Sequence, residues 1–205
     1  MSNTSIKGGL LESVTASIIE KFENAGGRIT ALVCDQGSNN RSLYNKLKIF
    51  PEQPYFIRNY KKIYAFYCTP HLIKSVRNYF MDNTLKTLDG FTNWSVIKEL
   101  YEMDKDNNVT RMCPKLTPNH IEPNSFGKMR VSYATQILSS SVASGIRTGI
   151  RHNSFSSQVI KYAEPSALLC EKFNKLFDIF NTRSANGPNI FKIAIQGRIW
   201  SKKLF

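Results

Sequence analysis

Asp35 is the residue whose type and position most clearly indicate chemistry. In the stretch Arg28–Asn40, an apolar run rich in β-branched residues ends at this acid and gives way to a polar turn. A buried strand that ends in a carboxylate is a common part of an active site in an α/β fold, because sheet positions are rigid. The pattern fits equally well a surface strand whose terminal Asp caps the next helix. The sequence leaves both interpretations of Asp35 open.

Basic side chains gather at the start of a second predicted element. Thr69 followed by Pro70 is a typical helix start, because the hydroxyl can cap the helix and proline suits its first position. We expect His71, Lys74 and Arg77 on the face opposite the apolar residues of this helix. They could face phosphates, or they could form an ordinary solvated basic face.

Several familiar sites are missing from the sequence. Cys68-x-x-His71 provides two metal ligands, but no second pair is visible, and the four cysteines form no CxxC pair. This spacing argues against a zinc ribbon or a disulfide framework and suits a reducing compartment. No GxxxxGK[ST] loop, GxGxxG, GxSxG or HExxH motif occurs, so Walker, Rossmann, α/β-hydrolase and zincin chemistry are not supported.

Charge indicates the class of partner. The 205 residues include 28 Lys+Arg and 15 Asp+Glu, which gives a net charge of +13 and favours a polyanionic partner. The asymmetry is greatest between residues 108 and 163, where Glu122 is the single acid among the basic residues Arg111, Lys115, Lys128, Arg130, Arg147, Arg151 and Lys161. No apolar run approaches the ~20 residues that span a bilayer, so we expect no membrane partner.

The remaining pattern predicts an α/β fold in two parts. Apolar residues at helical spacing predict an amphipathic helix over 10–22 whose stripe packs in the core and which ends at Gly26-Gly27. Strands are expected at 29–34, 55–57 and 62–67, with a turn at 58–61. Further helices are expected at 94–103, 126–146 and 166–182, with an exposed loop at 104–108. We place a domain boundary near residue 82.

Five separated motifs, in order, resemble the P-element transposases and the THAP-domain proteins derived from them. They are LVCDQGSNN, CTPHLIKSVRN, KLTPNHIEPNSFGKMRVSYATQILSSSVA, FNKLFDIFNTRS and the strand pair at 55–67 between the first two. The resemblance covers about residues 25–185. It implies a partial RNase H-like sheet-and-helix core over 1–81, followed by a mostly helical GTP-binding insertion domain over 82–205.

The resemblance implies a metal-dependent role for Asp35. It would be the second of three catalytic carboxylates that hold two Mg²⁺ ions, which activate a nucleophile and stabilise the leaving oxygen during attack on DNA. The first Asp and the final Glu of the family have no counterpart in this sequence. We therefore expect a fragment or remnant of a DNA transposase that is catalytically incomplete alone, and whether it is an enzyme stays open.

The resemblance also implies a nucleotide site in the insertion domain. The residues that it places near GTP are Lys115, Arg130, Val131, Ser139 and Asp178. Lys115 and Arg130 could meet phosphates, and Ser139 could donate a hydrogen bond. Asp178 could accept from the guanine N1 and N2 protons. Ser139 could instead be a helix-packing contact, and Asp178 a solvated helix charge.

The expected partners are GTP and DNA, the latter being transposon ends in the full-length family. DNA contacts are expected from His71, Lys74, Arg77, Lys128, Arg147 and Arg151. The resemblance also implies a nuclear location and an oligomer only with regions outside this sequence. Two alternatives remain open: a domesticated, non-enzymatic DNA- or protein-interaction module, and a small metal nuclease built on Asp35.

Overall fold

The computed structural model describes residues 8–107 and 110–181. These residues belong to two compact units, one ending at Leu72 and the other starting at Ile73. Along the chain, the boundary between the units falls within helix α3 (Thr69–Asp82). The boundary predicted from the sequence, near residue 82, lies at the end of that helix. The functional division into 1–81 and 82–205 stays a prediction.

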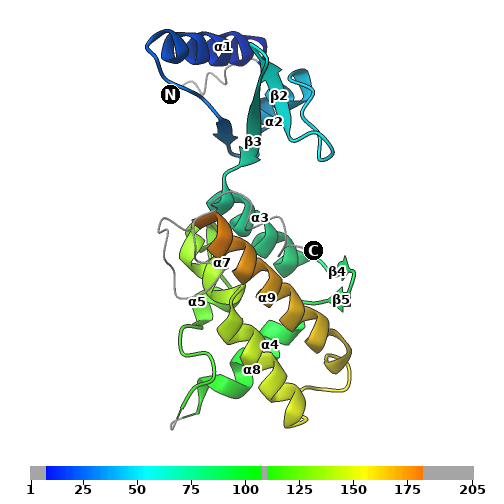
Figure 1. The fold of residues 1–205 in the computed structure, drawn as a ribbon. Coiled ribbons are helices and arrows are strands. Elements are labelled where there is room, and N and C mark those ends of the chain that lie inside the picture. Colours follow the sequence, from blue (N-terminus) through cyan, green and yellow to red (C-terminus); the bar gives the residue numbers. More distant parts are fainter. Residues whose placement is uncertain (1–7, 108–109, 182–205) are drawn as a thin grey trace. The chain divides into compact units, whose positions relative to one another are not determined.

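The first unit is a small sheet with two helices (Figure 1). Its elements are α1 (Gly8–Asn24), β1 (Ala31–Cys34), α2 (Ser38–Lys46), β2 (Tyr55–Arg58) and β3 (Lys61–Tyr67). The strand order is β1-β3-β2, with β1 parallel and β2 antiparallel to β3. Asn59 and Tyr60, both at positive φ, form the tight turn of the β2–β3 hairpin. The strands and the turn predicted from the sequence are confirmed.

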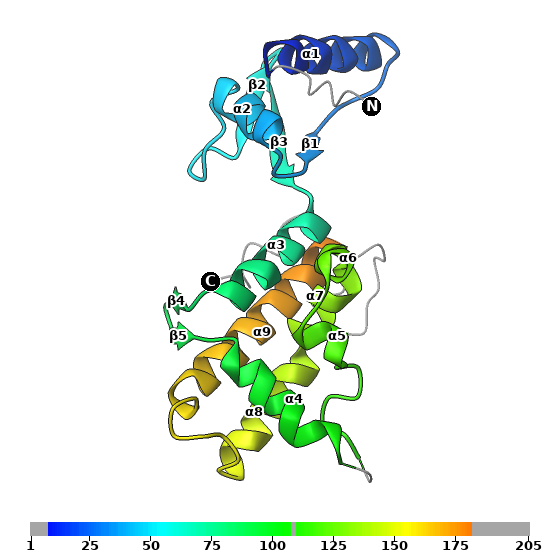
Figure 2. The ribbon, with the colours of Figure 1, turned by 180° about the vertical axis from the view of Figure 1, so that it is seen from behind.

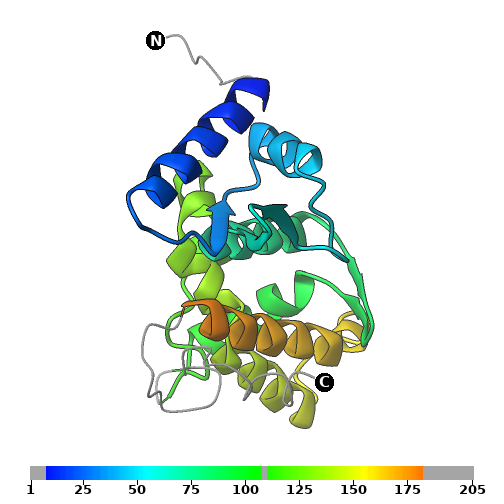
Figure 3. The same ribbon diagram turned by 45° about the horizontal axis from the view of Figure 1, so that its top comes forward.

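Only one face of this sheet is covered within the unit. Ile63 and Ala65 are two positions apart on β3, so their side chains point to the same face of the sheet. Helices α1 and α2 lie side by side on that face (Figure 3). On the other face, Tyr64 and Phe66 are 43% and 41% exposed. Of the two interpretations of the strand before Asp35, the surface strand fits within this unit, because the residues of β1 are exposed or half-buried and Val33 is 59% exposed.

Helix α1 ends as predicted but does not bury its apolar stripe. Gly26 has a φ of +86°, the left-handed conformation that glycine supplies at a helix end. Of the stripe, Ile19 is buried in the core, whereas Leu10, Val14, Ile18 and Phe22 are exposed. The expected core packing of the whole stripe is therefore wrong. Helical spacing selects a face of the helix, but α2 and the sheet cover only part of it.

The second unit is mostly helical (Figure 2). After α3 come a hairpin, β4 (Leu85–Thr87) and β5 (Gly90–Thr92), and then α4 (Ser95–Lys105). The chain continues through α5 (Pro118–Ile121), α6 (Ser125–Met129), α7 (Val131–Ile137), α8 (Ser140–Arg151) and α9 (Ile160–Asn181). None of the described helices is both long and apolar enough to cross a membrane.

Helices α8 and α9 lie side by side in this unit, and one continuous core joins them to α3, α4 and α7. Its centre is fully closed: Phe80, Leu100, Ile137, Ile146 and Cys170 are each 0% exposed. All four cysteines are free thiols. The mixed fold of helices and small sheets is confirmed, and an RNase H-like core stays a prediction.

The single helix predicted over 126–146 is wrong, because the chain forms three helices there. The backbone leaves the helical region at Arg130 (ψ 119°) and at Ser139 (φ −129°, ψ 157°). Ser139 caps α8, which serine does well at a helix start and poorly in a helix interior. The start predicted for the last helix is also late: α9 begins at Ile160 and contains Pro165.

Candidate nucleotide-binding site

A pocket of about 450 Å³ opens at the N-terminus of α8. Its walls come from the loop between α4 and α5, the second half of α7, the first turn of α8 and one side chain of α9. The lining residues are Cys113, Pro114, Lys115, Leu116, Thr135, Gln136, Ser139, Ser140, Ser141, Val142 and Asn174. The lining is rich in amide and hydroxyl groups and carries one cation, Lys115.

The helix start supplies hydrogen-bond donors. Ser139 Oγ accepts from the Val142 amide at 3.3 Å and donates to the Gln136 carbonyl at 2.7 Å. The Ser140 amide donates to Asn174 Oδ1 at 3.4 Å, which ties α9 to this end of α8. The amides of Ser140 and Val142 are thus already paired with side chains. What the start of α8 offers an anion is its partial positive charge.

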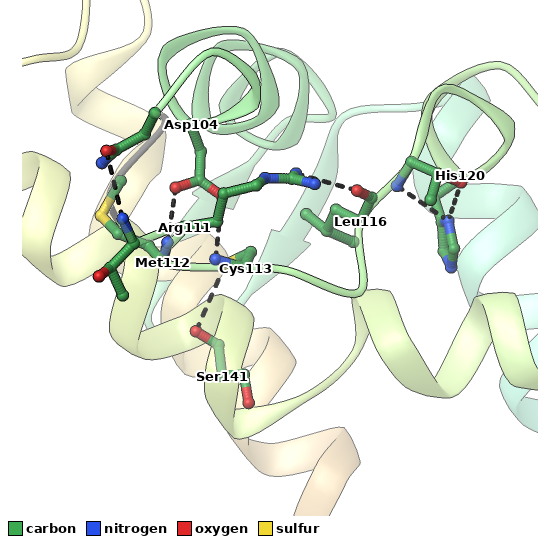
Figure 4. Close-up of polar contacts among 10 residues, drawn as sticks. Asp104, Arg111, Met112, Cys113, Leu116, His120 and Ser141 are labelled. Carbon is green, nitrogen blue, oxygen red and sulfur yellow. Dashed lines mark hydrogen bonds and ion pairs between the residues drawn. The ribbon is translucent and has the colours of Figure 1, made fainter.

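A buried carboxylate shapes the loop that carries Lys115 (Figure 4). Asp104 is 0% exposed and accepts from the Met112 amide at 2.6 Å and the Cys113 amide at 2.9 Å. Arg111 lies 3.5 Å from the same carboxylate and donates to the Leu116 carbonyl at 2.9 Å. The prediction of an exposed loop over 104–108 is therefore wrong for Asp104, which is buried in the last turn of α4 and organises the pocket wall, whereas Lys105, Asp106 and Asn107 are exposed.

The same loop is held against α8 by a close approach at Gly145. A Cβ there would lie 2.7 Å from Cys113 Sγ, so only glycine leaves room for this sulfur. The Cys113 thiol is 2% exposed, and its S–H points to the Ser141 carbonyl at 3.6 Å. Burial, and then the charge of Asp104, raise the pKa of Cys113 to about 12, so the side chain packs as a neutral thiol.

A buried histidine contacts the pocket from behind α7. His120 is 3% exposed, and its Nε2 lies 2.6 Å from Gln136 Oε1. Its Nδ1 accepts from the Thr117 amide at 3.2 Å. Burial lowers the pKa of His120, and the nearby positive charge of Arg77 lowers it further. The ring is therefore neutral at pH 7.

The predicted nucleotide residues are only partly brought together. Lys115 and Ser139 line the pocket. Asp178 is not part of the pocket lining, but its Oδ2 accepts from Nδ2 of the lining residue Asn174 at 3.1 Å. Arg130 and Val131 lie at the α6–α7 junction, outside the pocket lining, and Arg130 lies over the Tyr133 ring.

Sequence reasoning missed five polar residues of the lining: Thr135, Gln136, Ser140, Ser141 and Asn174. A signal existed for Asn174, because it lies four positions before Asp178 and hence on the same helix face. No comparable signal marks Gln136, whose place depends on the break between α7 and α8. As a set, a lysine, a helix N-terminus and several hydroxyls and amides fit the phosphates of a nucleotide.

Among the predicted nucleic-acid residues, Arg77 is a clear correction. It is 0% exposed, and its Nη2 donates to the carbonyls of Gly127 (3.3 Å) and Lys128 (3.0 Å). Its spacing from Ile73 and Phe80 explains this, because residues four and three apart share a helix face. Arg77 therefore belongs to the apolar face of α3 and is not available to DNA.

The other five predicted contacts differ in availability. His71 and Arg151 are exposed, and Lys74 and Lys128 are half-buried. Arg147 is paired with Glu164 at 3.2 Å and with Glu171 at 3.0 Å, so two acids already neutralise it. These roles in DNA binding stay predictions.

The strand end at Asp35 has the geometry of a capped turn. Asp35 Oδ1 accepts from the Gly37 amide at 2.8 Å and from Asn40 Nδ2 at 2.7 Å. These two donors hold the pKa of this exposed carboxyl below its usual value. Across residues 8–107 and 110–181, no three side chains of His, Cys, Asp or Glu gather to hold a metal ion. The described residues therefore do not form a Mg²⁺ site, and Asp35 as a metal ligand stays a prediction.

Comparison with known proteins gives a consistent family. A family model described as the TNP-like, GTP-binding insertion domain matches residues 70–193. The chain is 33% identical over 172 residues to the transposable element P transposase of Drosophila melanogaster, covering 82% of this chain and 22% of that protein. It is 26% identical over 135 residues to the human DNA transposase THAP9, covering 63% of this chain and 14% of that protein.

A solved structure agrees with these relatives. The match is to the Drosophila P element transposase strand transfer complex, with a TM-score of 0.77 and 29% identity. It covers 93% of this chain and 42% of that one, so the chain spans less than half of the solved protein and under a quarter of each curated relative. The chain belongs to the P-element transposase family, and residues 70–193 belong to its TNP-like, GTP-binding insertion domains.

Proposed function

We propose that this chain is a nucleotide-binding part of a P-element-like transposase and that it binds GTP in the pocket at the N-terminus of α8. The observation that carries the proposal is the convergence of Lys115, the α8 N-terminus and several hydroxyls on one pocket within the matched GTP-binding domain. In this site the phosphates meet Lys115 and the partial positive charge at the start of α8. Ser139 caps that helix by accepting from the Val142 amide, which fixes where the helix starts.

The base would lie toward Asn174 and Asp178 in this proposal. The carboxylate of Asp178 suits the guanine N1 and N2 protons, which adenine does not present in that arrangement. Its bond to Asn174 Nδ2 means that reading the base directly requires Asn174 to move. Arg130 and Val131 would reach the ligand only by a shift of the α6–α7 junction.

Calorimetry with GTP and ATP tests the proposal. We expect GTP to bind more tightly than ATP. Lys115→Ala should weaken the affinity for GTP roughly tenfold or more, because the substitution removes a charge-assisted phosphate contact of about 1.5–3 kcal/mol. Lys86→Ala is the matched control, since it removes the same charge from an exposed position outside the pocket lining. Equal binding of GTP and ATP, or equal effects of the two variants, would contradict the assignment.

DNA binding is the second part of the proposal. It is supported by the net charge of +13 and by the likeness to a chain in a strand transfer complex. His71, Lys74, Lys128 and Arg151 would meet phosphates. The nuclear location expected of a DNA partner belongs to this proposal and is checked by imaging the tagged chain.

Salt-dependent binding to duplex DNA tests this part, with Lys74 and Arg77 as a pair on one helix. Lys74→Ala should weaken binding and make the dependence on salt less steep by about one phosphate contact. Arg77→Met keeps the volume of a buried side chain and should leave the salt dependence unchanged. If Arg77→Met flattens the salt dependence as much as Lys74→Ala, the buried placement of Arg77 is wrong. DNA binding indifferent to GTP would favour the non-enzymatic DNA-binding module.

A further inference from the structure

We propose that Gln136 reads the 6-position of a purine base through its amide NH₂ group, and that His120 is the positioning residue that fixes the orientation of this amide. The inference rests on the proposed function, because it places a nucleotide in the pocket at the α8 N-terminus. It adds a specificity-determining side chain that lies outside the set predicted from the sequence.

The hydrogen bonds around His120 determine which end of the Gln136 amide faces which way. The Thr117 backbone N–H donates to His120 Nδ1 at 3.2 Å, and the Thr117 hydroxyl, 2.8 Å from the same nitrogen, can rotate to donate to it as well. Because a backbone N–H can only donate, Nδ1 is the acceptor. A neutral imidazole that accepts at Nδ1 carries its proton on Nε2. The atom of Gln136 at 2.6 Å from Nε2 is therefore the oxygen, and the amide nitrogen is the other end.

That nitrogen is left for a ligand. Gln136 lines the pocket and is half-buried. Within residues 8–107 and 110–181, the side chain of Gln136 makes one hydrogen bond, the one with His120, and that bond uses its oxygen. An amide whose oxygen is engaged and whose NH₂ group is free presents only donors to the pocket.

A fixed donor separates the two common purines. Guanine has a carbonyl oxygen at position 6, which accepts from the NH₂ group of Gln136. Adenine has an amino group there, so two donors would face each other. Rotating the amide to suit adenine would place its NH₂ group against the N–H of His120, which leaves a buried donor unpaired. The pair Gln136–His120 therefore favours a 6-oxo purine.

The groups packed around His120 keep it neutral and in place. The Tyr133 ring packs against it at a tilt of 40° with centroids 4.3 Å apart, and Arg130 donates to the Tyr133 hydroxyl at 3.2 Å. The buried cation Arg77 opposes a second positive charge on the ring. These neighbours connect Arg130, which lies outside the pocket, to the orientation of Gln136 inside it.

Calorimetry of the full chain with GTP, ITP and ATP tests the inference. ITP keeps the 6-oxo group and lacks the 2-amino group, so the wild type should bind GTP and ITP at least tenfold more tightly than ATP if position 6 is read. Gln136→Leu should weaken GTP and ITP about tenfold and leave ATP within twofold. Gln136→Glu replaces the donor with an acceptor and should reverse the preference in favour of ATP.

Two substitutions of His120 separate positioning from packing. The side-chain nitrogen of His120→Gln mimics Nε2 and can still donate to Gln136, whereas His120→Asn mimics the Nδ1 side and cannot. We expect the preference for GTP over ATP to survive in His120→Gln and to be lost in His120→Asn. Melting temperatures accompany each variant, and the half-exposed Gln136 variants decide the question if a His120 variant does not fold.

The outcomes are distinguishable. Equal weakening of all three nucleotides by Gln136→Leu, or no change, overturns the reading of position 6 while the proposed function stands. Tight GTP with weak ITP in the wild type places the discrimination at the 2-amino group and also overturns it. A wild type that binds no nucleotide, or GTP and ATP equally, refutes the proposed function before any variant is measured, and the inference with it.

Discussion

The two units differ in how far they bury their apolar and polar side chains. The second unit encloses a core whose central side chains are 0% exposed and also buries polar groups such as Asp104 and His120. The first unit leaves Ile18, Val33 and Ile57 exposed, at 60%, 59% and 65%. The second unit thus encloses an apolar core together with polar groups, some of which, such as Arg77 Nε and Nη1, have no hydrogen-bond partner among the described residues. The first unit leaves one sheet face and part of α1 uncovered within the unit.

The difference shows what an apolar pattern predicts. Apolar residues at spacing 3–4 or 2 identify a face of a helix or strand. Whether that face is buried depends on the elements that pack against it. Two aspartates at the ends of regular elements make the same point. Asp35 follows β1 and accepts hydrogen bonds in an exposed turn, whereas Asp104 lies in the last turn of α4 and organises the loop after it from a buried position.

Replacing the two aspartates should give the largest contrast. Asp104→Ala removes a buried acceptor of two backbone amides and leaves Arg111 without its partner, so we expect a loss of about 3–5 kcal/mol in the free energy of unfolding. Asp35→Ala breaks two bonds of a solvent-exposed turn and should cost far less. Urea unfolding, with hydrogen exchange to resolve the two units, measures both.

Asp104→Ala should also change nucleotide binding, and Asp106→Ala is its control. Asp104→Ala should weaken GTP binding, because the loop that carries Lys115 loses the two hydrogen bonds of its Met112 and Cys113 amides to this carboxylate. Asp106→Ala, a substitution of an exposed neighbour, should leave GTP binding unchanged. Similar losses of stability for Asp35→Ala and Asp104→Ala would break the comparison between the two regions.

A smaller contrast is expected between neighbouring residues of α1. Ile19 is 4% exposed and Ile18 is 60% exposed. Ile19→Ala should lower the free energy of unfolding of the first unit by about 2–4 kcal/mol, and Ile18→Ala by less than about 0.5 kcal/mol. Hydrogen exchange of the β3 amides reports on this unit. A large effect of Ile18→Ala would show that its face is covered in solution.

The smallest effect concerns pH and the buried His120. Its pKa is lowered in the folded protein, so above the ordinary value of 6.5 both states are neutral and the full stability is present. Below 6.5 the unfolded chain takes up a proton that the folded chain resists, and stability falls by at most about 1.4 kcal/mol per pH unit. His120→Gln should lack this component between pH 6.5 and 5.5.

The matched comparison removes other titrations. His71 and His152 are exposed and present in both proteins, so their contributions cancel. Parallel stability curves for the wild type and His120→Gln would show that burial of His120 carries no such cost.

Much of the fold could be predicted because its signals are local. The β2–β3 hairpin, the start of α3 at Thr69 and Pro70, and the end of α1 at Gly26 each depend on residues within a few positions. The lining of the proposed nucleotide pocket was predicted in part, because Lys115 and Ser139 belong to motifs that resemble those of the family. Gln136 could not be found in this way, since its place in the pocket depends on the break after α7 and its side chain is held by His120, sixteen positions away.

The errors have one physical origin. Arg77 was expected in solvent because it is charged, but its spacing from Ile73 and Phe80 places it inside, where two backbone carbonyls accept from it. Ser139 was expected within a helix, but its hydroxyl caps a new one. In both cases a long-range or capping hydrogen bond offsets the preference of the residue type.

By itself the sequence determined the family, the basic charge, the order of most elements and the positions of Lys115 and Ser139, because these depend on residue identity and short-range spacing. Only the tertiary structure decided which groups are buried and which converge. It buried Arg77, Asp104 and His120, left much of α1 exposed, and joined three separate segments into one pocket. Burial and convergence depend on what packs against a residue, and local spacing does not contain that information.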